Sequence, residues 1–278
     1  MNLLEKTINN YRWQIRNISA QKRTLPSCLI VGAQKAGTSS LSHFISQHPQ
    51  IHSPLQKEVH FFSGGMNPNI DNYAKGEKWY KAHFPLQKNI APKDITFEAT
   101  PMYLFHPLVP GRIKTLLPKC KIIILVRNPV ERAISHFFHV VRHGYETLSI
   151  EQAMQTELSR LQKVLANKDY GNPVYRLYSY QSRGLYLEQI KRYQSFFPSN
   201  QLLILSSEQL MTASQTVLTQ VFNFLDIDSH LEITNLQAQN QGGNKQKVSD
   251  EVYAQLREFF SVPNQQLFEH LGTDFNWN

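Results

Sequence analysis

The chain has 278 residues, of which 41% are hydrophobic and 18% are charged, a composition typical of a globular protein with one large domain. Its formal net charge of +8 points to an anionic partner, either a small ligand or an acidic polymer. The basic residues form no run and no zinc-finger, basic-zipper or RNA-recognition signature, so we expect no nucleic-acid partner.

The sequence shows no export signal. The first ten residues lack the charged and apolar regions of a secretion signal, and no apolar run approaches the roughly 18–20 residues of a membrane span. Cys28 and Cys120 both fall in or beside predicted buried strands and are interpreted as small core residues. We therefore expect a cytoplasmic protein.

Predicted strands and helices alternate along the chain. Residues 1–24 are predicted to be a helical lead-in, and 25–278 a single domain. The strands are expected at 28–31, 95–97, 121–126 and 202–205. Helices are expected after Thr38 and at about 75–84, 112–117, 129–138, 185–197, 207–225 and 250–271. Residues 145–182 are expected to be largely helical, with a break at Gly171-Asn-Pro173. The last helix is expected to be interrupted at Pro263, and the polar segment 239–247 to be a mobile loop.

The run Lys121–Val126 is apolar after its first residue, without alternation, which indicates burial on both faces as in a parallel sheet. Strands followed by helices, several times over, indicate an open parallel sheet flanked by helices. The predicted fold class is therefore α/β.

The stretch from Cys28 to Phe44 is the strongest candidate for an anion site. An apolar strand is followed by a loop from Gly32 to Gly37, and Thr38 and Ser39 are then expected to cap a helix. The unpaired N–H groups and the dipole of a helix N-terminus favour negative charge. Lys35, in the loop, adds a positive charge.

This loop resembles a phosphate-binding Walker A loop but departs from it. Gly32 and Gly37 keep the glycine spacing, yet Thr38 stands where the lysine belongs, and Lys35 lies inside the loop. The change favours a single phosphate or phosphosulfate ligand with no obligatory metal. The alternative is an ordinary strand-to-helix turn with a solvated lysine.

A second anion site is predicted at the carboxyl end of the strand 121–126, the edge where open α/β sheets bind ligands. Arg127 emerges there, and Ser135 follows about two helical turns later. An arginine fork and a hydroxyl can grip a second phosphate, while Arg132 can join them or face solvent. The alternative is a structural ion pair at Arg127 and a surface serine.

Taken together, these segments resemble the sulfotransferases that use 3′-phosphoadenosine 5′-phosphosulfate (PAPS). The loop matches their 5′-phosphosulfate loop, and Arg127 with Ser135 matches their 3′-phosphate motif. Three further segments look like the heparan sulfate (glycosaminoglycan) branch: Lys57–Phe62, Thr100–Tyr103 and Phe268–Trp277. The five matches run in the family's order from about residue 25 to the end.

The resemblance implies a P-loop-like sulfotransferase fold and in-line transfer of a sulfuryl group from PAPS to a hydroxyl or amine, and the expected acceptor is a carbohydrate. The implied donor-binding residues are Lys35, Ala36, Gly37, Thr38, Ser39, Arg127, Ser135 and Arg183. The family's late Lys-Gly-Arg loop is absent. Gln241-Gly-Gly-Asn-Lys245 occupies its place, and Lys245 is the candidate substitute. Lys35 and the loop N–H groups would stabilise charge on the leaving phosphate.

By resemblance, Glu58 is the general base and His60 the second choice. Phe61 and Phe62 are expected to desolvate Glu58 and raise its pKa. The alternative is a solvated carboxylate paired with Lys57.

Two positions depart from the heparan sulfate branch. Ser63 replaces an acidic residue, and Ala99 replaces the lysine of a Glu-Lys-Thr-Pro motif. Both bear on acceptor binding.

Two other functions are weighed against this one. A kinase or NTPase should carry lysine at position 38 and a carboxylate at the end of a second strand for Mg²⁺, where this chain has Thr38 and Arg127. A non-catalytic binder of nucleic acid or another polyanion should lose affinity steeply with salt and tolerate the loss of Glu58.

Overall fold

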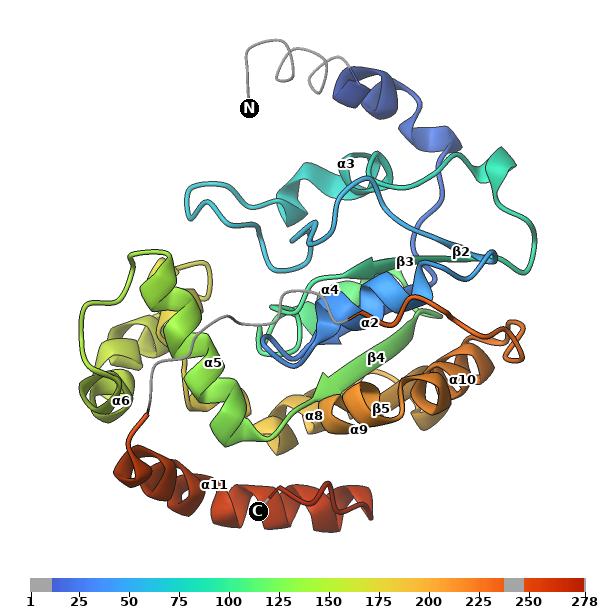
Figure 1. Ribbon diagram of the computed structural model, residues 1–278. Helices are drawn as coiled ribbons and strands as arrows, with labels where there is room; N and C mark the ends of the chain where they lie inside the picture. The colour runs from blue at the N-terminus through green and yellow to red at the C-terminus, as the bar shows by residue number, and fades with distance from the viewer. Residues whose placement is uncertain (1–11, 238–247, 278) are drawn as a thin grey trace.

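The computed structural model describes residues 12–237 and 248–277 (Figure 1). Its centre is a five-stranded sheet in the order β2-β3-β1-β4-β5, in which every neighbouring pair is parallel. The strands are β1 (Cys28–Gly32), β2 (Ile51–His52), β3 (Ile95–Ala99), β4 (Lys121–Val126) and β5 (Leu202–Ser206). The predicted α/β fold with an open parallel sheet is confirmed.

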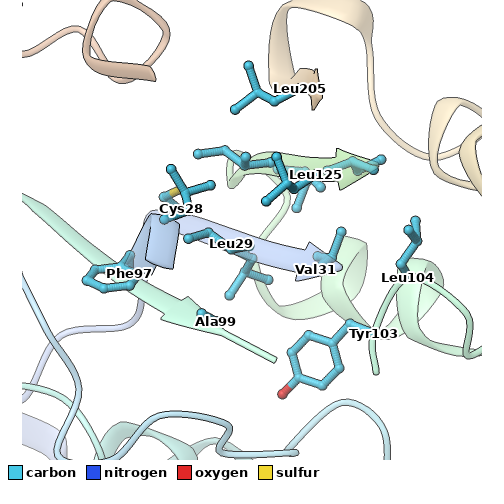
Figure 2. Packing of buried hydrophobic residues seen from close by; sticks show 14 of the residues in the cluster. Cys28, Leu29, Val31, Phe97, Ala99, Tyr103, Leu104, Leu125 and Leu205 are labelled. Atoms are coloured by element: carbon cyan, nitrogen blue, oxygen red, sulfur yellow. The ribbon is translucent and has the colours of Figure 1, made fainter. Parts of the chain in front are cut away.

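The middle of the sheet is buried on both faces. All five residues of β1 and the last five of β4 are buried, and the two strands pair with Cys28 opposite Lys121. Figure 2 shows Leu29 and Val31 of β1 among apolar side chains from the neighbouring strands. Fully burying one such aliphatic side chain contributes about 1.5–3 kcal/mol. Cys28 and Cys120 are free and buried in this core, as predicted.

Helices connect the strands, as parallel pairing requires. They are α2 (Thr38–Ile45), α3 (Gly76–Lys81), α4 (Val109–Leu116), α5 (Pro129–Arg142), α6 (Ile150–Ala166), α7 (Pro173–Leu177), α8 (Tyr186–Gln194), α9 (Ser207–Thr212), α10 (Ser214–Leu225) and α11 (Asp250–Leu271). In Figure 1, α2 lies over the sheet, packed on β1 and β3. A second apolar cluster joins α5, α6 and α11.

Two helix predictions were wrong. The helix expected over 207–225 is divided at Ala213, whose ψ of 50° leaves the helical region. The interruption expected at Pro263 does not occur. The helix α11 continues through this proline. Phe259 and Val262 are 40% and 60% exposed, so water can reach the carbonyl that loses its N–H partner to proline.

The segment before the domain packs against the region around α3. Residues 12–18 are helical, and a 3₁₀ turn, η1 (Ala20–Lys22), follows. The Trp13 ring lies 4.7 Å from the His83 ring and 5.9 Å from the Trp79 ring, measured between centroids. No helix among residues 12–237 and 248–277 has both the length and the apolar character that crossing a membrane requires.

Candidate active site

The loop between β1 and α2 has the geometry of an anion cradle. Gly37 caps the helix with a φ of 91°, a left-handed conformation that glycine adopts without strain. The prediction that Thr38 and Ser39 cap the helix is wrong, because the N-cap position is held by Gly37, and Thr38 is already the first helical residue. Thr38 is instead buried, and the Ser39 hydroxyl accepts a hydrogen bond from Lys57. The first N–H groups of a helix have no partner within the helix and remain available to a ligand.

Lys35 occupies this loop with a left-handed φ of 69° and a half-buried side chain. Burial lowers the pKa of its ammonium, and the charges of Arg142, Arg127 and Arg132 lower it further. Among these groups only the Glu58 carboxylate raises it. The loop therefore concentrates positive charge that an anionic ligand would stabilise.

Arg127 joins the end of β4 to this loop. Its Nη1 donates a hydrogen bond to the backbone oxygen of Lys35, 3.0 Å away, and its Nη2 lies 3.8 Å from a carboxylate oxygen of Glu131. Both anion motifs predicted from the sequence are thus brought to one edge of the sheet. The Arg127 side chain is 31% exposed, so its guanidinium can still reach a ligand.

The helix α5 adds groups that the sequence analysis missed. Ser135 is half-buried, and His139 and Arg142 follow it at intervals of four and three residues, which places all three on one helix face. Burial lowers the pKa of His139 to about 4, and Lys35, His143 and Arg142 lower it too. The spacing of four and then three residues after Ser135 could have predicted from the sequence that His139 and Arg142 share its helix face.

Two arginines lie behind the loop rather than in it. Arg132 is fully buried and donates to the carbonyl of Tyr180, so it does not face solvent. Arg183 is 2% exposed, and its Nη1 donates to Oε1 of Gln34 at 2.8 Å. Burial lowers the pKa of Arg183 to about 9. Lys245 and the whole of the predicted mobile loop, 239–247, lie outside the described residues.

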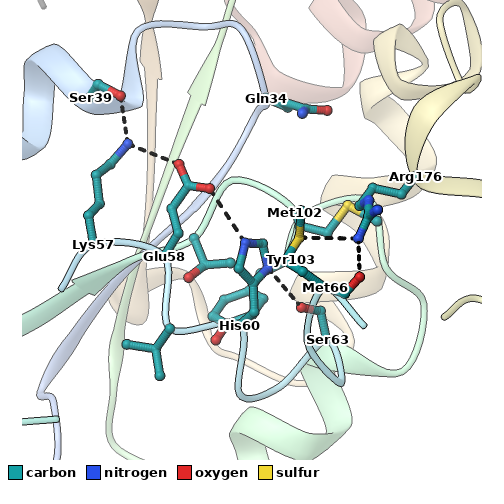
Figure 3. Close-up of polar contacts among 12 residues, drawn as sticks. Gln34, Ser39, Lys57, Glu58, His60, Ser63, Met66, Met102, Tyr103 and Arg176 are labelled. Carbon is teal, nitrogen blue, oxygen red and sulfur yellow. Dashed lines mark hydrogen bonds and ion pairs between the residues drawn. The ribbon is translucent and has the colours of Figure 1, made fainter. Parts of the chain in front are cut away.

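Glu58 lies opposite the loop, where Figure 3 shows its carboxylate between Lys57 and His60. The Lys57 ammonium is 3.2 Å from Oε1 of Glu58 and 2.6 Å from the Ser39 hydroxyl, so it links Glu58 to α2. His60 Nε2 is 3.5 Å from Oε2 of Glu58. Backbone strain accompanies this arrangement, since Glu58 and His60 have φ values of 60° and 54°.

The expectation of a raised Glu58 pKa was wrong. Burial does raise it, but the hydrogen bond from His60 and the charge of Lys57 outweigh burial and bring the pKa to about 2. Phe61 and Phe62 do not desolvate the carboxylate, because both pack into a buried aromatic cluster with Tyr80. The Glu58 side chain is 41% exposed, and its pairing with Lys57 matches the alternative interpretation in part.

Glu98 is a buried carboxylate on β3 to which the sequence assigned no role. It lies next to the residue that holds the backbone of Glu58. Glu98 is fully buried at the end of β3 and accepts hydrogen bonds from the hydroxyls of Tyr80, Thr100 and Tyr103. Its pKa is raised, because burial outweighs these hydrogen bonds. The next residue, Ala99, accepts a hydrogen bond from the Glu58 N–H at 3.2 Å. The end of β3 thus fixes the backbone of Glu58.

A cavity of about 570 Å³ opens beside Glu58. Hydroxyl groups of α2 form one wall, and β3 contributes Phe97 and Ala99. His43 also lines the cavity, and its Nε2 is buried without a hydrogen-bond partner among the described residues. In the described part of the chain, no three His, Cys, Asp or Glu side chains are grouped closely enough to hold a metal ion.

Comparison with known proteins gives a consistent set of relatives. The chain is 28% identical to mouse heparan sulfate glucosamine 3-O-sulfotransferase 5, over 91% of the chain and 74% of that protein. It is 34% identical to human bifunctional heparan sulfate N-deacetylase/N-sulfotransferase 2, over 76% of the chain. The chain spans 66% of the membrane-associated sulfotransferase kil1 of Dictyostelium discoideum and 23% of the human bifunctional enzyme.

The fold agrees with these relatives. A crystal structure of a sulfotransferase from Alicyclobacillus acidocaldarius superposes with a TM-score of 0.75 at 29% identity, covering 91% of this chain and 99% of the other. The model of the sulfotransferase domain family matches residues 25–261, which contain the anion loop, Glu58 and Arg127. The chain therefore belongs to the sulfotransferase domain family.

Proposed function

We propose that this enzyme transfers a sulfuryl group from PAPS to a hydroxyl of a carbohydrate acceptor. One observation carries the proposal: the half-buried Lys35 lies in the loop before α2, Arg127 donates to its carbonyl at 3.0 Å, and the charges of Arg142, Arg127 and Arg132 all lower its pKa. Such a concentration of positive charge is costly until an anion with several charges binds. PAPS carries its charges at two separated positions.

The residues fit this donor. Lys35 and the N–H groups of Gly37, Thr38 and Ser39 would hold the 5′-phosphosulfate, and Arg127 with Ser135 would hold the 3′-phosphate. The Ala36 N–H donates to the carbonyl of Ala33 at 3.1 Å, so Ala36 would shape the loop rather than donate to the ligand. Arg183 would act from behind the loop, through its 2.8 Å bond to Gln34. When bound, PAPS supplies an activated sulfuryl group. Lys35 and the helix N-terminus would then stabilise negative charge on the leaving phosphate oxygen.

Glu58 is the proposed general base. With a pKa of about 2 it is ionised at every physiological pH and is always able to accept a proton from the acceptor hydroxyl. A carboxylate of such low pKa is a weak base, so the proton transfers only as the acceptor oxygen acquires positive charge. The proton would then leave Glu58 for solvent, to which 41% of its side chain is exposed, while His60 Nε2, 3.5 Å from Oε2, holds the carboxylate in place.

Support for a carbohydrate acceptor comes from the cavity beside Glu58. Ser39 and Ser42 of α2 line it, together with Ser46 just after the end of the helix, and their hydroxyl groups can bond a ligand hydroxyl. Two of the relatives named above, the mouse and human enzymes, are heparan sulfate enzymes by name, which favours a glycan. Ser63 and Ala99 remove charged groups from the family pattern, so this acceptor is expected to differ from heparan sulfate.

The decisive experiment is calorimetric titration with 3′-phosphoadenosine 5′-phosphate (PAP), the product of the donor, with AMP and ATP–Mg²⁺ as controls. We expect PAP to bind at least about tenfold more tightly than AMP, since a second phosphate contact contributes about 1.5–3 kcal/mol. Equal affinity for PAP and AMP would contradict the donor assignment, whatever the acceptor. Sulfate transfer from radiolabelled PAPS to a panel of oligosaccharides then tests the acceptor class.

A further inference from the structure

A second cavity, of about 350 Å³, lies between the N-terminal segment and the domain. Arg16 and Arg23 line it together with Ser53, Pro54, Leu55, Pro85, Leu86 and Asn89. None of these eight residues is acidic. Arg16 and Arg23 precede residues 25–261, the part of the chain that the family model matches. This cavity is therefore built partly from a segment outside the matched domain.

The two guanidinium groups converge on one backbone oxygen. Arg16 Nη2 and Arg23 Nη1 each donate to the carbonyl of Phe84 at 2.8 Å, and Arg16 Nε donates to the carbonyl of Ala82 at 2.7 Å. Arg23 also donates to the hydroxyl of Ser19. These neutral acceptors fix the geometry of both side chains but leave their charges uncompensated.

Neither arginine has a carboxylate partner within ion-pair distance among residues 12–237 and 248–277. Arg23 is 8% exposed and Arg16 is half-buried, and Arg16 Nη1 has no hydrogen bond in this part of the chain. Burying two neighbouring positive charges without a counter-charge is unfavourable, and an anion between them would offset the cost. The guanidinium fork suits carboxylate, sulfate and phosphate groups alike.

The position of the cavity relates it to catalysis. Ser53 and Pro54 line both this cavity and the larger one that contains Glu58 and Lys57. The two cavities therefore adjoin, and Ser53 and Pro54 form the ridge between them. An extended acceptor with its reacting hydroxyl at Glu58 can cross this ridge and place another part of itself beside the arginines.

We propose that Arg16 and Arg23 form an anion subsite that binds a negatively charged group of the acceptor, at a distance from the hydroxyl that is sulfated. The inference rests on the proposed sulfuryl transfer and adds that the acceptor carries an anionic substituent. The subsite selects and orients the acceptor and takes no part in the chemical step.

The test uses the full chain saturated with PAP and two tetrasaccharide probes. One alternates glucosamine with glucuronate, and the other is its carboxyl-reduced counterpart, which is identical except for the charge. Calorimetry should show the carboxylated probe binding at least about tenfold more tightly, the gain expected from one charge-assisted contact. Equal affinities, or no binding of the carboxylated probe, would overturn the proposal.

Variants locate the effect. Arg16→Gln should remove most of the preference for the carboxylated probe and leave affinity for the reduced probe unchanged, whereas Arg16→Lys should retain part of it. Lys22→Gln is the matched control, because it removes the same charge from an exposed residue of the same segment. A loss that is the same for both probes would show a merely structural role.

A second variant does not depend on removing a buried arginine. Asn89→Asp places a carboxylate in the cavity wall at an exposed position, and it should weaken only the carboxylated probe. Gln87→Glu, exposed in the same 3₁₀ turn but outside the cavity wall, is its control. PAP affinity and sulfate transfer to the reduced probe are measured in parallel. If the wild type neither binds PAP nor transfers sulfate to the reduced probe, the proposed function is refuted. If it does both, but with the same KM for the carboxylated and the reduced probe, only the subsite is refuted.

Discussion

Nη1 of Arg127 donates a hydrogen bond to the backbone carbonyl of Lys35, 3.0 Å away, so the residue expected to hold the 3′-phosphate also holds the loop expected to bind the 5′-phosphosulfate. The two ends of the proposed donor would thus contact one connected structure at the carboxyl edge of β1 and β4. This connection makes the two anion sites interdependent.

Arg127→Ala should therefore weaken two ligands to different extents. Loss of the direct phosphate contact should reduce PAP affinity by about 10–100-fold, the equivalent of about 1.4–2.8 kcal/mol. Adenosine 5′-phosphosulfate, which lacks the 3′-phosphate, should lose only the smaller part that comes from the loosened loop. Calorimetry with both nucleotides measures the difference, and equal losses would contradict the 3′-phosphate assignment. Arg257→Ala, on α11, is a control for the change in net charge.

Lys35→Ala should abolish measurable PAP binding or turnover without destabilising the fold. The lysine is half-buried near three arginines, and its removal relieves repulsion in the free protein. We expect the melting temperature to stay within a few degrees of the wild type, a shift that corresponds to about 1 kcal/mol. Unchanged PAP affinity would rule out the ligand role, and Lys191→Ala, an exposed lysine on α8, is the matched control.

The strands at the centre of the sheet were predictable because their sequences permit little else. Lys121–Val126 is apolar without alternation after its first residue, and β4 has these bounds. Arg127 could be placed at the sheet edge because residues that follow a parallel strand emerge there. The order of the motifs identified the family, and the match over residues 25–261 confirms it.

The electrostatics of Glu58 could not be predicted from sequence neighbours. Phe61 and Phe62 stand three and four residues after it, but the left-handed backbone at Glu58 and His60 turns those rings into the core. The same turn brings the His60 imidazole and the Lys57 ammonium to the carboxylate, and these contacts lower its pKa. The cavity lined by Arg16 and Arg23 could not be predicted from the sequence either, because it depends on where residues 12–24 pack.

His83 should make the protein less stable in mild acid. Its side chain is buried between Trp13 and Trp79, and neither ring nitrogen has a hydrogen-bond partner among the described residues. Burial lowers its pKa to about 4 from an ordinary value of 6.5, and Arg16 and Lys75 contribute. Between these two values the unfolded chain binds the proton and the folded chain does not, so stability falls as pH decreases from about 6.5 to 4.

The variant His83→Phe should remove this dependence. The contribution of His83 amounts to at most about 2 kcal/mol between pH 7 and pH 5, and the phenylalanine ring keeps the packing with both tryptophans. Urea unfolding at the two pH values should therefore show a smaller difference for the variant than for the wild type. His230→Phe, at an exposed position, should leave the difference unaltered. An identical pH dependence in His83→Phe and wild type would contradict a neutral, buried histidine.

Glu58→Gln should lower kcat by about 10²–10⁴-fold, the usual contribution of a general base, with PAP affinity nearly unchanged. Glu188→Gln, an exposed carboxylate on α8, is the control. A parallel loss of PAP affinity would assign Glu58 a structural role instead.

The pH dependence of turnover separates base catalysis from simple charge effects. Because the Glu58 pKa is about 2, its protonation should cause no loss of kcat between pH 7 and pH 5. Lys57→Met removes an ammonium that favours the carboxylate, while the burial that raises the pKa persists. The acidic limb of the kcat profile should therefore move to higher pH in this variant, by up to about 0.7 unit, since ion pairs as exposed as this one contribute about 0.2–1 kcal/mol. A profile with the same acidic limb in Lys57→Met and wild type would show that the titration of Glu58 does not control the rate.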